Sequence, residues 1–143
     1  MNKFFALIAF LILVSCSKSD RDSNCKYLAN VSVNRAVNLN LPEYSQLQFT
    51  SNSVFIANEG IYGIIVINVG NNSFRAWEAT DPNHTPTSSC SQLTIEGVNA
   101  VCGCTDANEY SLFTGQSIGA NLGCGLKEYR VEAAGSNSIV ITN

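Results

Sequence analysis

The stretch "IYGIIVINVGNNSFRAWEA", residues 61–79, decides the fold class of this chain. It contains two segments, 61–69 and 73–79, that are rich in β-branched and aromatic residues and are therefore typical of β-strands. Between them stand Gly70, Asn71 and Asn72, which favour a tight turn because glycine and asparagine tolerate the backbone conformations that such turns need. The stretch predicts two strands separated by a turn.

The same pattern extends to both sides of this stretch. Residues 31–41, "VSVNRAVNLNL", alternate apolar and polar side chains, as expected of a strand with one buried face. No segment shows a helical period, and we find no internal repeat. The sequence predicts an all-β antiparallel sandwich or barrel of roughly eight to ten strands. We expect its larger aromatic residues in the core or on the strand faces, namely Phe55, Phe74, Trp77 and Tyr129.

The N-terminus predicts export. Lys3 is followed by an apolar run, residues 4–14, that is too short to remain as a membrane-spanning helix. The sequence LVSC at 13–16 resembles the bacterial lipobox, in which the chain is cut before the cysteine and the cysteine is acylated. The resemblance implies a signal peptide at 1–15, a lipid on Cys16 and a flexible tether that reaches residue 28. The alternative is an ordinary secretory signal.

Composition restricts the function classes. Residues 29–143 suffice for one domain with a hydrophobic core and are too few for two. The net charge is −3, only 13% of residues are charged, and there is no run of Lys and Arg, which argues against a nucleic-acid partner. No nucleophile and base stand in a spacing that indicates catalysis. We therefore assign no catalytic residue and expect a protein that is not an enzyme.

Three irregular loops interrupt the strands in the C-terminal half. They have the sequences "EATDPNHTPTSSCSQ" at 78–92, "CGCTDAN" at 102–108 and "GQSIGANLGCG" at 115–125. Loops carried on a β scaffold are frequent binding sites. We expect these three to form a small loop-rich subdomain that contains the functional site.

The order of these segments, from about Gly63 to Asn143, resembles the Rieske iron–sulfur family. That family has a C-x-H loop, a hairpin, a C-x-C-H loop, an aromatic strand ending in glycine, a third loop and two closing strands. Two cysteines and two histidines of the loops hold a [2Fe–2S] cluster. The aromatic residue and the glycine match Tyr110 and Gly115 here. The four ligand positions fall on Asp81, Asn83, Cys102 and Thr105.

Only Cys102 keeps the type of ligand that the family uses. The chain has a single histidine, His84, so one chain cannot supply the two histidines of such a cluster. The resemblance therefore implies a Rieske-like domain that has lost its cluster and holds no cofactor. The alternative is a [2Fe–2S] electron carrier that retains or borrows its centre.

The cysteines indicate disulfides, because exported domains meet an oxidising environment. Many Rieske domains bridge their first two loops through the middle position of the C-x-C-H motif, which is Cys104 here. Cys90 is the only cysteine in the first loop, so the resemblance implies a Cys90–Cys104 bond. Cys25 and Cys124 are a possible second pair. Cys102, Cys25 and Cys124 could also pair differently.

Two further readings of these loops are metal binding and redox chemistry. His84, Cys90, Cys102 and Cys104 would suit a tetrahedral zinc ion, although C-x-C is tighter than the usual ligand spacing. Cys102 and Cys104 could exchange disulfides, but no basic neighbour in the sequence would stabilise a thiolate. In "DPNH", Asp81 indicates a turn, and His84 is expected as an exposed loop residue.

These observations predict a lipoprotein of the cell envelope, anchored to a membrane by its lipid and either periplasmic or surface-exposed. Its expected role is non-catalytic, as a binding module or an accessory subunit of an envelope assembly. Its ligand is not apparent from the sequence.

Overall fold

The computed structural model describes Cys25 and residues 27–86 and 89–143. The predicted signal peptide and Cys16 lie outside these residues. Within them, no helix is long and apolar enough to cross a membrane. The elements are β1 (Asn34–Asn38), the 3-10 helix η1 (Ser45–Gln48), β2 (Ser53–Ile56), β3 (Ile64–Gly70), β4 (Ser73–Glu78), β5 (Leu93–Glu96), β6 (Asn99–Cys102), β7 (Glu109–Ser111), β8 (Ser117–Ile118), β9 (Glu128–Ala133) and β10 (Ser138–Thr142).

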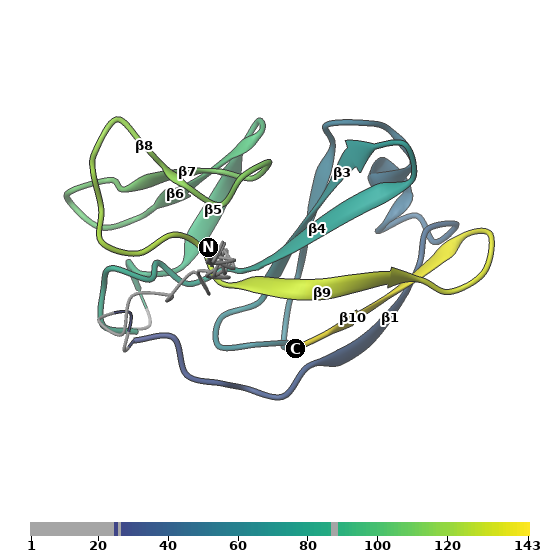
Figure 1. The fold of residues 1–143 in the computed structure, drawn as a ribbon, viewed down its shortest axis with the longest axis horizontal. Coiled ribbons are helices and arrows are strands. Elements are labelled where there is room, and N and C mark those ends of the chain that lie inside the picture. Colours follow the sequence, from purple (N-terminus) through teal and green to yellow (C-terminus); the bar gives the residue numbers. More distant parts are fainter. Residues whose placement is uncertain (1–24, 26, 87–88) are drawn as a thin grey trace, which may run out of the picture.

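The strands form two curled antiparallel sheets. The larger sheet has six strands in the order β1-β10-β9-β4-β3-β2, and the smaller has four in the order β5-β6-β7-β8. The smaller sheet is inserted in the chain between β4 and β9, which are neighbours in the larger one, and it lies to one side of it (Figure 1). The predictions of an all-β fold and of its strand number are confirmed for the described residues.

The turn predicted within residues 61–79 joins β3 to β4. The two strands pair antiparallel, with Gly70 opposite Ser73 and an irregular register between Asn68 and Gly70. Asn71 and Asn72 have positive φ angles of 52° and 55°, the combination that two-residue hairpin turns require at both central positions. The choice of asparagine at this turn thus follows from its tolerance of the left-handed conformation.

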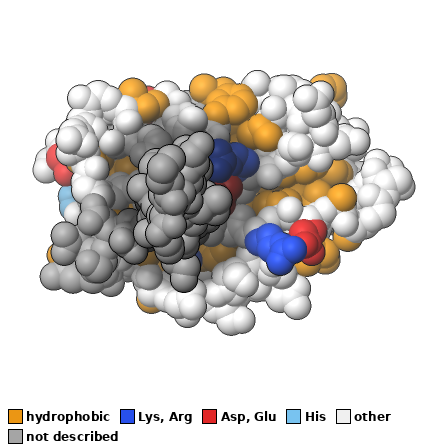
Figure 2. All heavy atoms as spheres, in the orientation of Figure 1, with side chains coloured by type: hydrophobic (Ala, Val, Ile, Leu, Met, Phe, Trp, Pro, Cys, Tyr) orange, Lys and Arg blue, Asp and Glu red, His pale blue; other side chains and the backbone are white. Residues whose placement is uncertain are grey.

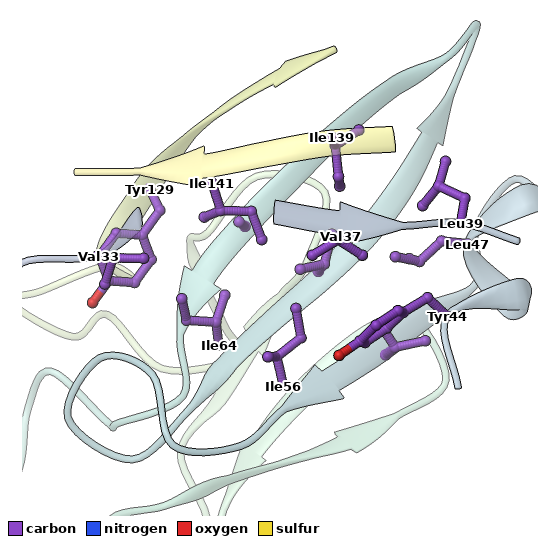
Figure 3. Close-up of a cluster of buried hydrophobic side chains, with 13 residues drawn as sticks. Val33, Val37, Leu39, Tyr44, Leu47, Ile56, Ile64, Tyr129, Ile139 and Ile141 are labelled. Carbon is purple, nitrogen blue, oxygen red and sulfur yellow. The ribbon is translucent and has the colours of Figure 1, made fainter. Parts of the chain in front are cut away.

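The continuous apolar run in β3 has a tertiary explanation, because both faces of this strand are covered. Ile64 and Val66 point into a core formed with the other strands of the larger sheet and with η1 (Figure 3). Ile65 points into a second core, which lies between the two sheets. Side chains alternate between the faces of a strand, so a strand buried on both sides needs apolar residues at every position.

The expected aromatic core residues differ in their burial. Trp77 and Tyr129 are 2% and 1% exposed. Phe74 is partly buried against the first core. Phe55 is 40% exposed, because β2 is an edge strand of the larger sheet.

A buried carboxylate ends β4. Glu78 is 0% exposed and accepts hydrogen bonds from the N–H groups of Ile61 and Tyr62 at 2.9 and 3.1 Å. The hydroxyls of Thr80 and Tyr129 donate to it at 2.9 and 2.7 Å. A buried carboxylate with four donors is well compensated for lost water, so Glu78 holds the loop before β3 against β4 and β9.

Two details differ from the sequence analysis. The small subdomain is not made of loops alone, because its centre is a four-stranded sheet and the third loop contains the short strand β8. Within the predicted tether, Cys25 forms a disulfide with Cys124.

On the face drawn in Figure 2, charged side chains are few and scattered among uncharged surface.

Candidate functional site

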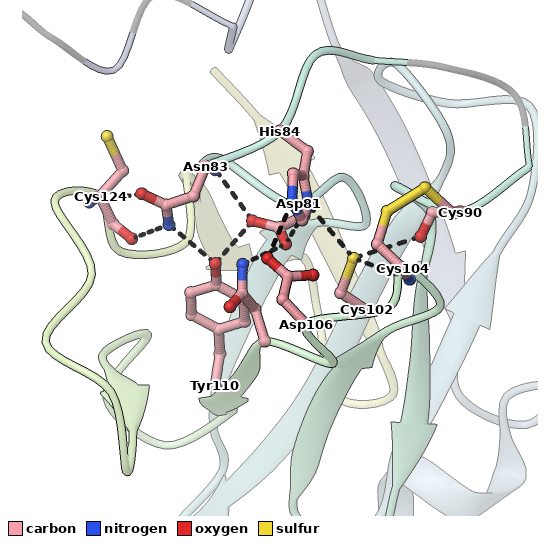
Figure 4. A network of polar contacts seen from close by, with 10 residues as sticks. Asp81, Asn83, His84, Cys90, Cys102, Cys104, Asp106, Tyr110 and Cys124 are labelled. Atoms are coloured by element: carbon pink, nitrogen blue, oxygen red, sulfur yellow. Dashed lines mark hydrogen bonds and ion pairs between the residues drawn. A yellow bond between two sulfur atoms is a disulfide. The ribbon is translucent and has the colours of Figure 1, made fainter.

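The loops that follow β4, β6 and β8 meet beside the smaller sheet. In the structure the first loop follows β4 as residues 79–92 and the second follows β6 as residues 103–108, while the part of the third loop that follows β8 comprises residues 119–127. Figure 4 shows side chains of the first two loops pointing toward one another, with the Cys124 backbone of the third loop beside Asn83. The expected gathering of three loops is therefore present, and its centre is Asp81.

Asp81 is 0% exposed and is surrounded by hydrogen-bond donors. Its Oδ1 accepts the Tyr110 hydroxyl at 2.6 Å and the Asn83 N–H at 2.8 Å. Its Oδ2 accepts the Asn108 side chain at 3.0 Å. Burial acts to raise the pKa of Asp81, but these hydrogen bonds outweigh it and the pKa lies below its usual value. Asp81 is thus a buried, ionised carboxylate.

Tyr110 and Asn83 extend the network to the third loop. Burial and then Asp81 raise the pKa of Tyr110, so its hydroxyl remains a donor. Asn83 Nδ2 donates to the Tyr110 oxygen and to the Cys124 carbonyl, each at 2.8 Å. The Cys124 N–H donates to Asn83 Oδ1 at 3.1 Å. Through these bonds the Asn83 side chain holds the first loop against the backbone of the third loop.

His84 lies between two carboxylates. Its Nδ1 is 3.0 Å from Asp81 Oδ2, and its Nε2 is 2.9 Å from Asp106 Oδ2. The His84 side chain is 28% exposed and that of Asp106 is 47% exposed. His84 is thus a loop residue that is only partly exposed, because its ring lies between Asp81 and Asp106.

Cys102 is the free cysteine of the described residues, and it is buried. Its Sγ lies 3.5 Å from His84 Nδ1, donates to the Cys90 carbonyl at 3.2 Å and accepts the Cys104 N–H at 3.4 Å. Burial raises the pKa of Cys102 to about 12, and the Asp81 carboxylate also raises it, while the Cys104 N–H lowers it. At neutral pH Cys102 is a thiol and a poor nucleophile.

Two disulfides fasten the loops. Cys90 joins Cys104, linking the first loop to the second, and Cys25 joins Cys124 of the third loop. The first pair is the one that the resemblance implied, and the second is the pair that the sequence analysis named as possible. Because Cys90 and Cys104 are bonded to each other, the set His84, Cys90, Cys102 and Cys104 cannot act as metal ligands together in this oxidised state.

The structure brings together most of the residues that the sequence singled out. Asp81, Asn83, His84 and Cys102 share one network, whereas Thr105 is exposed on the second loop. The sequence analysis did not assign roles to Asp106, Asn108 or the Tyr110 hydroxyl. The sequence feature that could have pointed to these three residues is the run "CTDANEY" at 104–110, in which polar residues lead up to the aromatic strand residue Tyr110. The hydrogen bonds around Asp81 fix these polar loops together with the Cys90–Cys104 disulfide.

Comparison with known proteins identifies no family. No protein-family model matches the chain, and a search of curated proteins finds no significant relative.

Proposed function

We propose that this chain is an exported lipoprotein, held on a membrane of the cell envelope by a lipid on Cys16. Its β domain is Rieske-like and has lost its [2Fe–2S] cluster. It works as a non-catalytic binding module or accessory subunit, in the periplasm or at the cell surface. The single observation that carries this proposal is the Asp81 network, which fills the place where the family resemblance puts the cluster.

The arrangement of the sheets supports the Rieske-like reading. A small four-stranded sheet is inserted between two neighbouring strands of a larger sheet. The first two loops, which carry the cluster-ligand positions that the resemblance implies, lie side by side. They are joined by the Cys90–Cys104 disulfide, which is the bond that the resemblance implied. Shared architecture does not by itself supply a function, so the role depends on the chemistry of the loops.

The residues present do not fit a [2Fe–2S] cluster. Asp81 and Asn83 stand at the first pair of ligand positions, and their polar atoms already bond to protein donors and acceptors. At the second pair, Cys102 is a buried thiol and Thr105 is exposed. A cluster needs deprotonated thiolates and neutral imidazoles with open positions toward iron. These loops offer one thiol and no histidine at those four positions.

The same bonds support a non-catalytic role. The groups that could act as acid, base or nucleophile are His84, Asp81 and Cys102. Each is held by partners within the loops, and the Cys102 thiol is not activated. The composition of the chain argues against a nucleic-acid partner, because it has only 8 Lys and Arg against 11 Asp and Glu.

Metal analysis tests the loss of the cluster. Protein purified from an iron-sufficient host should be colourless, contain no stoichiometric iron or acid-labile sulfide and give no Rieske paramagnetic signal. Iron and sulfide in stoichiometric amounts would overturn the proposal and revive electron transfer. The accessory role is tested by affinity capture from native membranes, with a matched lipoprotein domain of another fold as control. Specific enrichment of envelope proteins is the expected result.

A further inference from the structure

Four side chains beside the Cys90–Cys104 disulfide have the composition of a metal site. They are those of His84, Cys102, Cys104 and Asp106, and their ligand atoms all lie within 4.8 Å of one another. Around a tetrahedral zinc ion, nitrogen, sulfur and oxygen ligands are roughly 3.3–3.8 Å apart, as follows from the usual zinc–ligand bond lengths. The most distant pairs of the observed group would therefore have to approach each other by about 1 Å to surround one ion.

The folded geometry answers the objection to zinc binding that the short C-x-C spacing of Cys102 and Cys104 raised in the sequence analysis. Two cysteines separated by one residue are unusual as zinc ligands, yet here the second loop curves so that the Cys104 N–H approaches Cys102 Sγ at 3.4 Å. Gly103 packs against the Cys90 backbone, where an added Cβ would lie 3.3 Å from the Cys90 carbonyl oxygen. The turn between Cys102 and Cys104 thus favours glycine at position 103, because a larger side chain there would press on the Cys90 backbone.

One of the four ligands is blocked in this structure, because Cys104 is bonded to Cys90. We propose that this disulfide controls a zinc site: when it is reduced, the chain binds one Zn²⁺ ion through His84, Cys102, Cys104 and Asp106. Two thiolates, an imidazole and a carboxylate are ligands that zinc accepts in tetrahedral sites. In the oxidised protein His84 and Asp106 pair with each other instead, at 2.9 Å.

The reaction has two steps. A dithiol reductant transfers two electrons and two protons to the Cys90–Cys104 bond, leaving two thiols, and is itself oxidised to a cyclic disulfide. Zn²⁺ then forms bonds to the sulfur atoms of Cys102 and Cys104, and one proton leaves each thiol. The ring of His84 gives up its Nε2 proton, and the Asp106 carboxylate exchanges its partner for the ion. The Cys90 thiol takes no part in binding.

Asp81 is positioned to orient the histidine. Its Oδ2 lies 3.0 Å from His84 Nδ1, so it can accept a hydrogen bond from the Nδ1–H group and leave Nε2, which faces Asp106, for the ion. A carboxylate behind a metal-binding histidine is a common supporting arrangement. The ion can enter from solvent, since the side chains of His84 and Asp106 are 28% and 47% exposed.

Zinc titration of the full-length protein in detergent tests this inference. Calorimetry would measure stoichiometry and affinity, and Co²⁺ would serve as a spectroscopic probe of tetrahedral thiolate coordination. Oxidised protein should bind no stoichiometric Zn²⁺, and protein reduced with a dithiol should bind one ion per chain. The Cys90→Ser variant, purified with its thiols reduced, should bind one ion after the reductant is removed, because Cys104 no longer has its disulfide partner.

Matched variants separate this site from other effects. In the Cys90→Ser background, His84→Ala should weaken zinc binding by more than about 100-fold, whereas Thr105→Ala, a change at a neighbouring exposed residue, should not alter it. The double variant Cys25→Ser/Cys124→Ser loses the other disulfide and should still bind no zinc when oxidised. Zinc should also raise the thermal midpoint of Cys90→Ser, which keeps the test valid if that variant folds poorly.

Three results would overturn the inference. The first is a reduced protein and a Cys90→Ser variant that bind no zinc and gain no stability from it. The second is binding that survives His84→Ala unchanged. The third is equal binding by oxidised wild-type protein. None of these results bears on the loss of the iron–sulfur cluster, which is decided by iron and sulfide content.

Discussion

The chemistry of the three loops depends on Asp81. This residue follows the last strand residue of β4 by three positions, and the fold turns its carboxylate away from solvent into a group of donors. The cost of burying a charge is offset when several hydrogen bonds are made to it. One side chain therefore holds residues of the first and second loops and of β7 in place.

We predict that Asp81→Asn destabilises the protein in a pH-dependent manner. The new amide nitrogen would face the donors that now bond to Oδ2, at a cost of about 2–3 kcal/mol at pH 7. The folded-state pKa of Asp81 is lowered, so its contribution is fully present above the unfolded value, about 3.9. It is lost as the pH falls through the folded-state pKa, because the wild type then becomes protonated.

Urea unfolding of both proteins between pH 7 and pH 3 would check this prediction. The gap in the free energy of unfolding should shrink toward the acid end of the range. Asp106→Asn is the control, because its side chain is 47% exposed and its removal should cost far less. A gap that stays constant with pH would contradict the assignment of Asp81 as an ionised group.

Among the elements, β4 connects the two sheets. Trp77, near its end, is buried in the core between the sheets, and its indole N–H donates to the Leu112 carbonyl at 2.7 Å. The turn between β7 and β8 packs on the same ring. At Gly115, which has a φ of +73°, an added Cβ would lie 2.6 Å from the ring of Trp77. Only glycine satisfies both the left-handed backbone and this close approach.

We predict that Gly115→Ala lowers the free energy of unfolding by about 2–4 kcal/mol, from backbone strain together with overpacking. Gly119→Ala is the matched control, because Gly119 has a similar φ of +78° but open space around it. It should show the strain alone, about 1–2 kcal/mol. Fluorescence of the single tryptophan during urea unfolding would measure both. Equal losses would mean that the packing on Trp77 contributes little.

For the whole molecule, one disulfide determines where the N-terminal segment is attached to the domain. The Cys25–Cys124 bond joins residues 99 positions apart and ties the N-terminal segment to the third loop. Cross-links that close long loops reduce the entropy of the unfolded chain the most. The domain thus meets its proposed membrane tether at the side of the smaller sheet.

The proposed anchor is tested by Cys16→Ser. This change should abolish fatty-acid labelling and leave the precursor uncut by the lipoprotein signal peptidase, because both steps need the cysteine of the lipobox. Radiolabelled palmitate and gel mobility would measure the outcome. Cys25→Ser is the control, since it removes the next cysteine of the chain without changing residues 13–16. If the Cys16→Ser protein still carries a fatty acid, the lipobox interpretation is wrong.

Local patterns were sufficient for the strands, the hairpin of β3 and β4 and the positions of the loops. Period-two alternation, β-branched residues and turn-forming Asn and Gly act between neighbours in the chain, so the sequence by itself determined them. The resemblance to a Rieske domain also led to the pairing of Cys90 with Cys104. The structure has that bond, while the family assignment stays a proposal.

Only the tertiary structure decided what the polar residues do. "DPNH" indicates a turn, and the bonds of Asp81 to Asn83 N–H and His84 lie within it. The other partners of Asp81 and His84 are Tyr110, Asn108 and Asp106, which stand at least 20 residues away in the chain. The burial of Glu78 and the coverage of β3 on both faces likewise depend on the packing of the two sheets. The sequence around these carboxylates does not reveal their burial, because the donors that compensate it come in part from segments that meet only in the folded molecule.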